Sequence, residues 1–137
     1  KYMLSEELKS IIEGDVEDSA EALTKYATDA SIFYVNPAVV VFPKTVEDIK
    51  KALSEKRTVI VPAAGRQLYN PYFTPPGPLY HMLVIKGFTK DGKFITNDPG
   101  TRRGANFIYK PDVLMNAIHD WNGGNVENGR KVIMIIG

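Results

Sequence analysis

The chain has 137 residues, of which 44% are hydrophobic and 24% are charged, and its formal net charge is +1. These values are typical of one soluble globular domain and argue against a nucleic-acid-binding surface, which is usually strongly basic. No apolar run approaches the roughly 20 residues of a membrane span, no signal peptide is visible, and the absence of cysteine excludes disulfides and thiol catalysis by these residues alone.

Two amphipathic helices are predicted at the start of the chain. The first covers residues 5–14, with Ser5 as its N-cap and its leucine and isoleucines on one face. The second covers residues 19–30, with Asp18 or Ser19 as its N-cap. Each helix has one apolar stripe, so both are expected to pack against a core.

A strand–helix–strand unit is predicted next. The run PAVVVFP, residues 37–43, has the length and the flanking prolines of a short buried strand. Thr45 then caps a helix over residues 45–56, and TVIVP at residues 58–62 is a second strand. Because a helix joins the two strands, we expect them to form a right-handed parallel unit.

The second part of the chain has a different composition. Residues 66–80 are rich in proline and tyrosine, which predicts an ordered aromatic loop. Three strands, one helix and a closing strand are predicted over residues 82–88, 93–97, 106–109, 111–121 and 131–137. The expected fold class is α+β, with α/β character on the N-terminal side and a mostly antiparallel sheet after it. The change of composition predicts a division into residues 1–53 and 54–137, with the seam near residues 45–60.

The predicted hairpin brings an imidazole and a carboxylate to matched ends of its two strands. The Asp-Gly pair in the connection is a strong turn signal, and we expect Phe88 to pair with Lys93. Asp98 then lies opposite Leu83, and His81 is its diagonal neighbour on the same face. In that position the carboxylate would orient one ring nitrogen and leave the other free to act as a base. A histidine beside a strand is also common as a purely structural residue, and a register slip of one residue would separate the pair.

Few other groups could complete a catalytic or metal site. The serines are the remaining candidate nucleophiles, and none lies in a Gly-x-Ser-x-Gly pattern; they are Ser5, Ser10, Ser19, Ser31 and Ser54. The two histidines, His81 and His119, have no further ligands at metal-binding spacing. We therefore expect neither a serine nucleophile nor a zinc site.

The segments TVIVPAAGRQLYNPYF, GPLYHMLVIKGF, FITNDPGTRRG and VLMNAIHDW resemble the C-terminal half of a papain-like cysteine peptidase domain. The similarity covers residues 53–137, and the nearest type is the bacterial domain akin to the bacteriocin-leader peptidases of export transporters. The resemblance implies that His81 is the catalytic base and that Asp98 orients it. Independently of the resemblance, Tyr69, Tyr72, Phe73 and Tyr80 with their prolines are candidates for the wall of a peptide groove, and the alternative is a local aromatic core. Arg102, next to Arg103, is a candidate for binding an anion or a peptide carboxylate, and the alternative is a solvated loop.

The chain departs from this family at the nucleophile. The family uses a cysteine on an N-terminal helix, preceded by a glutamine that helps to form the oxyanion hole, and neither motif is present here. The expectation is therefore an incomplete peptidase-like domain that keeps the His/Asp pair, is inactive alone, and binds a peptide or completes its site with a partner.

Residues 3–53 are similar to another family. The blocks YATDAS and PAVVVFPKTVEDI resemble the opening of an FAD-linked oxidase of the D-lactate or glycolate oxidase type. The alternative function is thus a fragment of an FAD-binding oxidoreductase, or a chimera of two families without activity. The loop after residues 58–62 holds one glycine, Gly65, where a pyrophosphate cradle needs several, so no bound cofactor is expected in the leading hypothesis.

Overall fold

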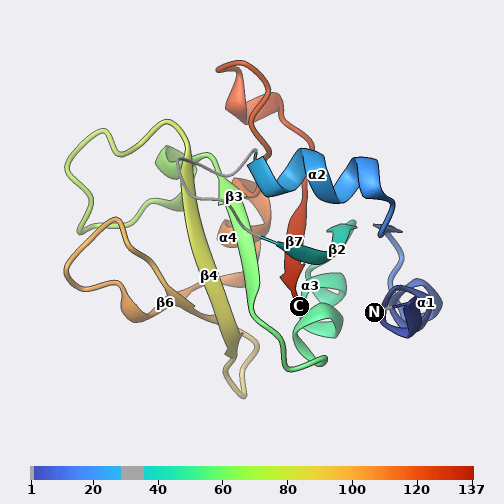
Figure 1. The fold of residues 1–137 in the computed structure, drawn as a ribbon. Coiled ribbons are helices and arrows are strands. Elements are labelled where there is room, and N and C mark those ends of the chain that lie inside the picture. The colour runs from blue at the N-terminus through green and yellow to red at the C-terminus, as the bar shows by residue number, and fades with distance from the viewer. Residues whose placement is uncertain (1, 29–35) are drawn as a thin grey trace.

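The computed structural model describes residues 2–28 and 36–137 (Figure 1). Within these residues, one seven-stranded sheet has the order β1-β2-β7-β3-β4-β5-β6, and all neighbouring strands are antiparallel. The strands are β1 (Asp15–Glu17), β2 (Pro37–Phe42), β3 (Val59–Ala63), β4 (His81–Phe88), β5 (Phe94–Asn97), β6 (Ala105–Tyr109) and β7 (Ile133–Ile136). The helices are α1 (Tyr2–Ile11), α2 (Ala20–Thr28), α3 (Val46–Leu53) and α4 (Pro111–Ala117), with 3-10 turns η1 (Gly65–Leu68) and η2 (Val126–Asn128). The predicted α+β fold is confirmed.

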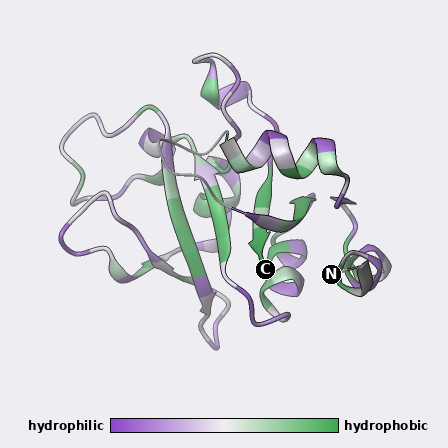
Figure 2. Cartoon of the chain, in the orientation of Figure 1, coloured by the Kyte–Doolittle hydropathy of each residue, from purple (hydrophilic) through white to green (hydrophobic). Residues whose placement is uncertain are grey.

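Helices cover the two faces of the sheet unequally. The larger core lies between one face and α1, α3 and α4, where Leu8, Ile49 and Leu114 are fully buried. On the other face α2 covers a smaller core, in which Tyr26 packs with Met134. Figure 2 shows the apolar central strands β3, β4 and β7 between helices that carry hydrophilic stretches. None of the described helices has the length and apolar character that crossing a membrane requires.

The predicted strand–helix–strand unit exists, but its strands are not neighbours. β2 and β3 both pair antiparallel with β7, so they run parallel to each other with β7 between them. β7 fits this position because Ile133 and Ile135 enter the larger core while Met134 enters the smaller one. A strand buried on both faces is stable in the middle of a sheet, which the sequence pattern alone could not locate.

Two of the predicted helix caps are confirmed and one is wrong. The Ser19 hydroxyl accepts the Ala22 N–H at 3.2 Å, and the Thr45 hydroxyl accepts the N–H of Asp48 at 3.1 Å. α1 already begins at Tyr2, so Ser5 lies inside the helix and bonds a side chain instead. The final residues of the predicted helix over 19–30 lie outside the described residues.

The predicted helix over residues 111–121 is too long. After α4 the chain becomes extended at Ile118, which forms a bridge to β3. The Lys131 ammonium donates to the Met115 carbonyl at 2.6 Å and satisfies the end of the helix. His119 therefore lies beyond the helix, where it is buried and donates from Nδ1 to a backbone carbonyl at 2.8 Å.

A buried carboxylate joins the N-terminal helix to the rest of the fold. Asp48 is completely buried in α3 and accepts three backbone N–H bonds, from Glu13 at 2.8 Å, Gly14 at 3.1 Å and Lys44 at 2.8 Å. Burial raises the pKa of this carboxyl, whereas the backbone N–H donors lower it. The donors together outweigh burial, so the pKa lies below its usual value. The ionised side chain thus holds the α1–β1 connection against the β2–α3 connection.

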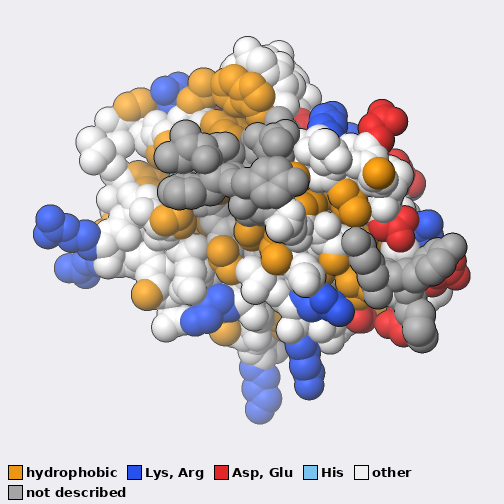
Figure 3. All heavy atoms as spheres, in the orientation of Figure 1, with side chains coloured by type: hydrophobic (Ala, Val, Ile, Leu, Met, Phe, Trp, Pro, Cys, Tyr) orange, Lys and Arg blue, Asp and Glu red, His pale blue; other side chains and the backbone are white. Residues whose placement is uncertain are grey.

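Charges are distributed unevenly over the surface. Figure 3 shows acidic side chains gathered on the side of the molecule where α1 and β1 lie, with lysine and arginine toward the opposite side and the lower end. The acidic residues of this segment are Glu6, Glu7, Glu13, Asp15, Glu17 and Asp18. The candidate site described next lies away from this acidic surface.

Candidate active site

The hairpin that carries the candidate pair has a different turn from the predicted one. Phe88 pairs with Phe94, whereas the sequence suggested Lys93. The reason is the turn itself: Gly92 adopts φ +89°, and the Thr89 N–H bonds the Lys93 carbonyl at 2.7 Å. A turn closed by a left-handed glycine adds a residue to the connection and shifts the register by one.

A β-bulge then restores the predicted register where it matters. The pairing shifts between Ile85 and Gly87, so that Val84 lies opposite Asn97. This is the register that places His81 and Asp98 on one face. Two opposite shifts, one at the turn and one at the bulge, cancel before the strand ends, and the hairpin presents both side chains to the same side.

The imidazole and the carboxylate are in direct contact. His81 Nε2 lies 2.6 Å from Asp98 Oδ1, and the two side chains are 10% and 0% exposed. Asp98 also accepts the Tyr109 hydroxyl at 2.6 Å and the Gly100 N–H at 2.9 Å. Burial raises the pKa of Asp98, whereas the hydrogen bonds from His81, Tyr109 and Gly100 lower it. The hydrogen bonds together outweigh burial, so the pKa of the carboxyl lies below its usual value.

The hydrogen bond fixes which ring nitrogen remains available. An ionised carboxylate is only an acceptor, so Nε2 of His81 carries the proton. Nδ1 then has a free lone pair in the neutral ring, and no described residue donates a hydrogen bond to it. In this arrangement a buried carboxylate holds the ring in one tautomer, and the second ring nitrogen faces away from the carboxylate.

Three groups that the sequence did not connect with the pair support it. The Tyr109 hydroxyl is held protonated, because burial and then the Asp98 carboxylate raise its pKa far above the usual value. Asn70 donates to this hydroxyl at 2.9 Å, and the Phe73 ring lies 5.2 Å from the His81 ring, edge to face. Tyr109 belongs to β6 and the other two to an irregular loop, so no periodic pattern marked them.

The loop after Asp98 is packed tightly against this cluster. A Cβ added to Gly100 would lie 2.8 Å from Phe73 and 2.9 Å from the His81 ring. A Cβ added to Gly104 would lie 1.6 Å from the Asp98 carbonyl oxygen. Neither glycine can therefore be replaced by a residue with a Cβ unless the loop moves.

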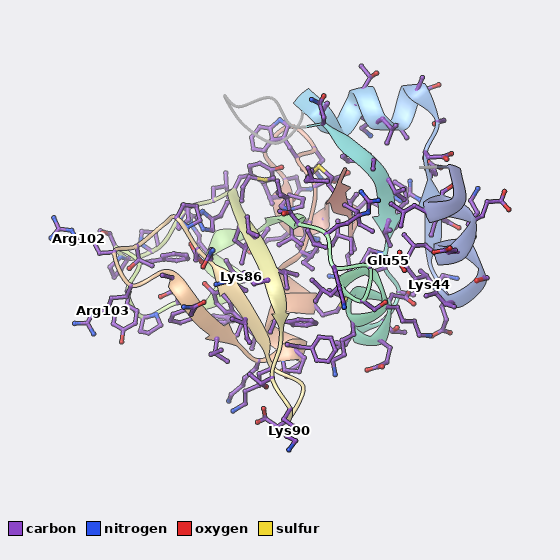
Figure 4. The ribbon with its side chains drawn as sticks, turned by 60° about the horizontal axis from the view of Figure 1, so that its bottom comes forward. Lys44, Glu55, Lys86, Lys90, Arg102 and Arg103 are labelled. Atoms are coloured by element: carbon purple, nitrogen blue, oxygen red, sulfur yellow. The ribbon has the colours of Figure 1, made fainter. Side chains whose placement is uncertain are left out.

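The candidate binding residues do not form one surface. Tyr69 is 76% exposed and Tyr72 is 47% exposed, and the Arg103 guanidinium lies 5.0 Å from the Tyr72 ring. Tyr80 is half-buried and its ring packs edge to face against Trp121 at 5.4 Å. In Figure 4, Arg102 and Arg103 extend outward at the end of the β5–β6 loop. Tyr69 and Tyr72 thus come from the loop that packs on His81, whereas Tyr80 contacts a different part of the chain.

The serines are engaged elsewhere. Ser5 bonds Asp18, Ser19 caps α2, and the hydroxyls of Ser10 and Ser54 bond carbonyls in their own helical turns. Ser31 lies outside the described residues. No group of three potential metal ligands occurs among the residues that the structure describes.

One protein family matches most of the chain. A sequence profile described as the Peptidase_C39 like family matches residues 6–123. The chain belongs to this family. No curated protein and no solved structure matches the chain. Membership of the Peptidase_C39 like family supports the papain-like cysteine-peptidase resemblance.

The second resemblance has no such support. No comparison finds an FAD-linked oxidase, and the family match begins at residue 6, inside the segment that suggested one. The loop after β3 also leaves no room for a pyrophosphate at its glycine, because a Cβ on Gly65 would lie 2.4 Å from the Pro78 carbonyl oxygen and 3.2 Å from the His81 Cβ. That space is filled by the chain itself.

The lowered pKa of Asp98 predicts a pH-dependent stability difference. A carboxyl with a depressed folded-state pKa stabilises the fold above its unfolded pKa of about 4, and this contribution is lost as the pH falls through the folded value. Asp98→Asn removes the contribution at every pH. Urea unfolding of both proteins between pH 6 and pH 3 should show the largest difference near pH 6 and a smaller one near pH 3. A difference independent of pH would contradict the lowered pKa.

Proposed function

We propose that this domain provides the catalytic base of a cysteine-type peptidase and that the thiol comes from outside these 137 residues. The observation that carries the proposal is the buried 2.6 Å contact between His81 Nε2 and Asp98, which leaves Nδ1 as the free base. Membership of the Peptidase_C39 like family supports it. Because the sequence contains no cysteine, these residues alone are proposed to be inactive.

The proposed chemistry assigns each group one step. Nδ1 of His81 accepts the proton of the thiol, and the thiolate attacks the peptide carbonyl. The resulting imidazolium donates that proton to the leaving amine when the C–N bond breaks, and water then hydrolyses the thioester. Asp98 stays ionised throughout: it holds the ring tautomer and stabilises the imidazolium. Tyr109 and Gly100 keep the carboxylate in place through their hydrogen bonds.

The thiol could be supplied in two ways that an experiment can distinguish. The polypeptide from the complete native reading frame should cleave peptides if the thiol is in the same chain. If a partner supplies it, the 137-residue chain should gain activity when that partner is added. In either case, alkylation with iodoacetamide should abolish cleavage, and the 137-residue chain alone should show none. Cleavage by the 137-residue chain that survives alkylation would contradict the proposal.

A further inference from the structure

A cavity of about 280 Å³ opens in the loop between β3 and β4, and one of its lining residues, Phe73, packs on the candidate base. Its lining includes Arg66, Tyr69, Asn70, Phe73, Pro75 and Pro76. Phe73 contacts both the cavity and the candidate base: it lines the cavity, and its ring lies 5.2 Å from the His81 ring. A peptide bound at His81 would pass the Phe73 ring before its neighbouring residues reached the cavity.

Tyr69 is held at this cavity in a costly conformation. Its φ is +53° and its ψ is +36°, a left-handed geometry that residues with a Cβ adopt rarely. Its neighbours Leu68 and Asn70 are 2% and 7% exposed, yet the Tyr69 side chain is 76% exposed. The ring forms no hydrogen bond or aromatic pair with the described residues. The fold thus fixes the backbone and presents the ring to solvent, which internal packing does not explain.

Arg66 adds a positioned positive charge to the same cavity. Its Nε donates to the Gly77 carbonyl at 3.2 Å, which restrains the guanidinium. It forms no ion pair with any carboxylate that the structure describes. A guanidinium held by one nitrogen still has two NH₂ groups, and carboxylates are their preferred acceptors.

We infer that this cavity is a peptide subsite that binds an apolar side chain next to a carboxylate. The apolar group would contact Tyr69, Phe73 and Pro75, and the carboxylate would bind Arg66. The carboxylate is either an acidic side chain or the C-terminus of the peptide. The inference rests on the proposed peptidase function for the meaning of the site. Asn70 connects the cavity wall to Tyr109 and hence to the candidate base, so the subsite keeps a fixed position relative to it.

Binding to the 137-residue chain tests the inference without any cleavage. The probes are four N-acetylated peptides: Gly-Gly-Phe with a free C-terminal carboxylate, Gly-Gly-Phe amide, Gly-Gly-Phe-Asp amide and Gly-Gly-Phe-Asn amide. Titration calorimetry at low ionic strength should show that one or both carboxylate peptides bind at least fivefold more tightly than their neutral counterparts. The peptide that shows this preference identifies the source of the carboxylate.

The variants separate the two parts of the subsite. Arg66→Gln should remove the preference for the carboxylate, while Lys90→Gln, at the distant hairpin tip, should change each Kd less than twofold. Tyr69→Asn should weaken all peptides about tenfold without lowering Tm, because asparagine tolerates the left-handed conformation better than tyrosine. A purely structural Tyr69 would instead change Tm and leave the Kd values alone.

Failure of this inference differs from failure of the proposed function. The inference is wrong if no peptide binds, if carboxylates give no advantage, or if Tyr69→Asn and Arg66→Gln bind like the unmodified chain. We call the protein that includes the thiol, either as the full native polypeptide or as a complex with the partner, the thiol-complete protein. If the subsite binds peptides as expected while the thiol-complete protein does not cleave them, only the proposed function fails.

Discussion

His81→Ala is expected to lower kcat/KM of the thiol-complete protein by at least about 1,000-fold, equivalent to about 4 kcal/mol of transition-state stabilisation. The alanine variant has no base to ionise the thiol and no acid to protonate the leaving amine. Steady-state hydrolysis of a peptide substrate measures the effect. His81 is about one-tenth exposed and its bond to Asp98 would be lost, so a thermal unfolding scan must accompany the kinetics.

Asp98 provides the matched comparison. Asp98→Asn keeps the size of the side chain but no longer fixes the tautomer with Nε2 protonated, so kcat/KM should also fall strongly. The double variant His81→Ala/Asp98→Asn should be hardly worse than His81→Ala alone, because the carboxylate acts through the imidazole. Additive losses would show that Asp98 contributes separately, and full activity in His81→Ala would contradict the assignment of the base.

The position of the candidate pair could be predicted because it depends on local rules. Side chains alternate along a strand, and a hairpin with an Asp-Gly turn has few geometries. The expected pairing of Phe88 was nevertheless wrong by one residue, and the prediction survived because the bulge after Ile85 compensates. The one sequence signal of this bulge is Gly87, because an isolated glycine within a strand often marks a bulge, but the glycine alone does not give the size or direction of the shift.

The support around the pair depends on contacts between distant segments. Tyr109 reaches Asp98 because β6 pairs with β5, and Asn70 reaches Tyr109 because an irregular loop folds back over the sheet. Neither contact follows from periodicity. The order of strands was similarly hidden: β1 has only three residues, too few for a pattern, and β7 enters between β2 and β3 from the end of the chain.

Asp48→Ala is expected to reduce the free energy of unfolding by about 3–5 kcal/mol, because three backbone N–H groups lose a charged acceptor and each loss costs about 1–3 kcal/mol. The substitution leaves the N–H groups of Glu13, Gly14 and Lys44 without the acceptor that the buried Asp48 side chain provides. Alanine also leaves a void beside α3. Urea unfolding at pH 7 measures the loss, and Tm should fall by about 10 °C or more.

Two further variants define the cause of that loss. Glu7→Ala removes a carboxylate from the exposed side of α1 and should change stability by less than about 0.5 kcal/mol. Asp48→Asn keeps one acceptor oxygen. Its amide NH₂ group faces either the Glu13 N–H or the N–H groups of Gly14 and Lys44, and it cannot accept from them. The asparagine variant should therefore be destabilised less than Asp48→Ala. Glu13 and Gly14, which Asp48 holds, lead directly into β1. The backbone amides of Asp15–Glu17 should therefore exchange their hydrogens faster in Asp48→Ala than in the unmodified chain. If Asp48→Ala unfolds at the same urea concentration as Glu7→Ala, the carboxylate is not what holds α1 to the sheet.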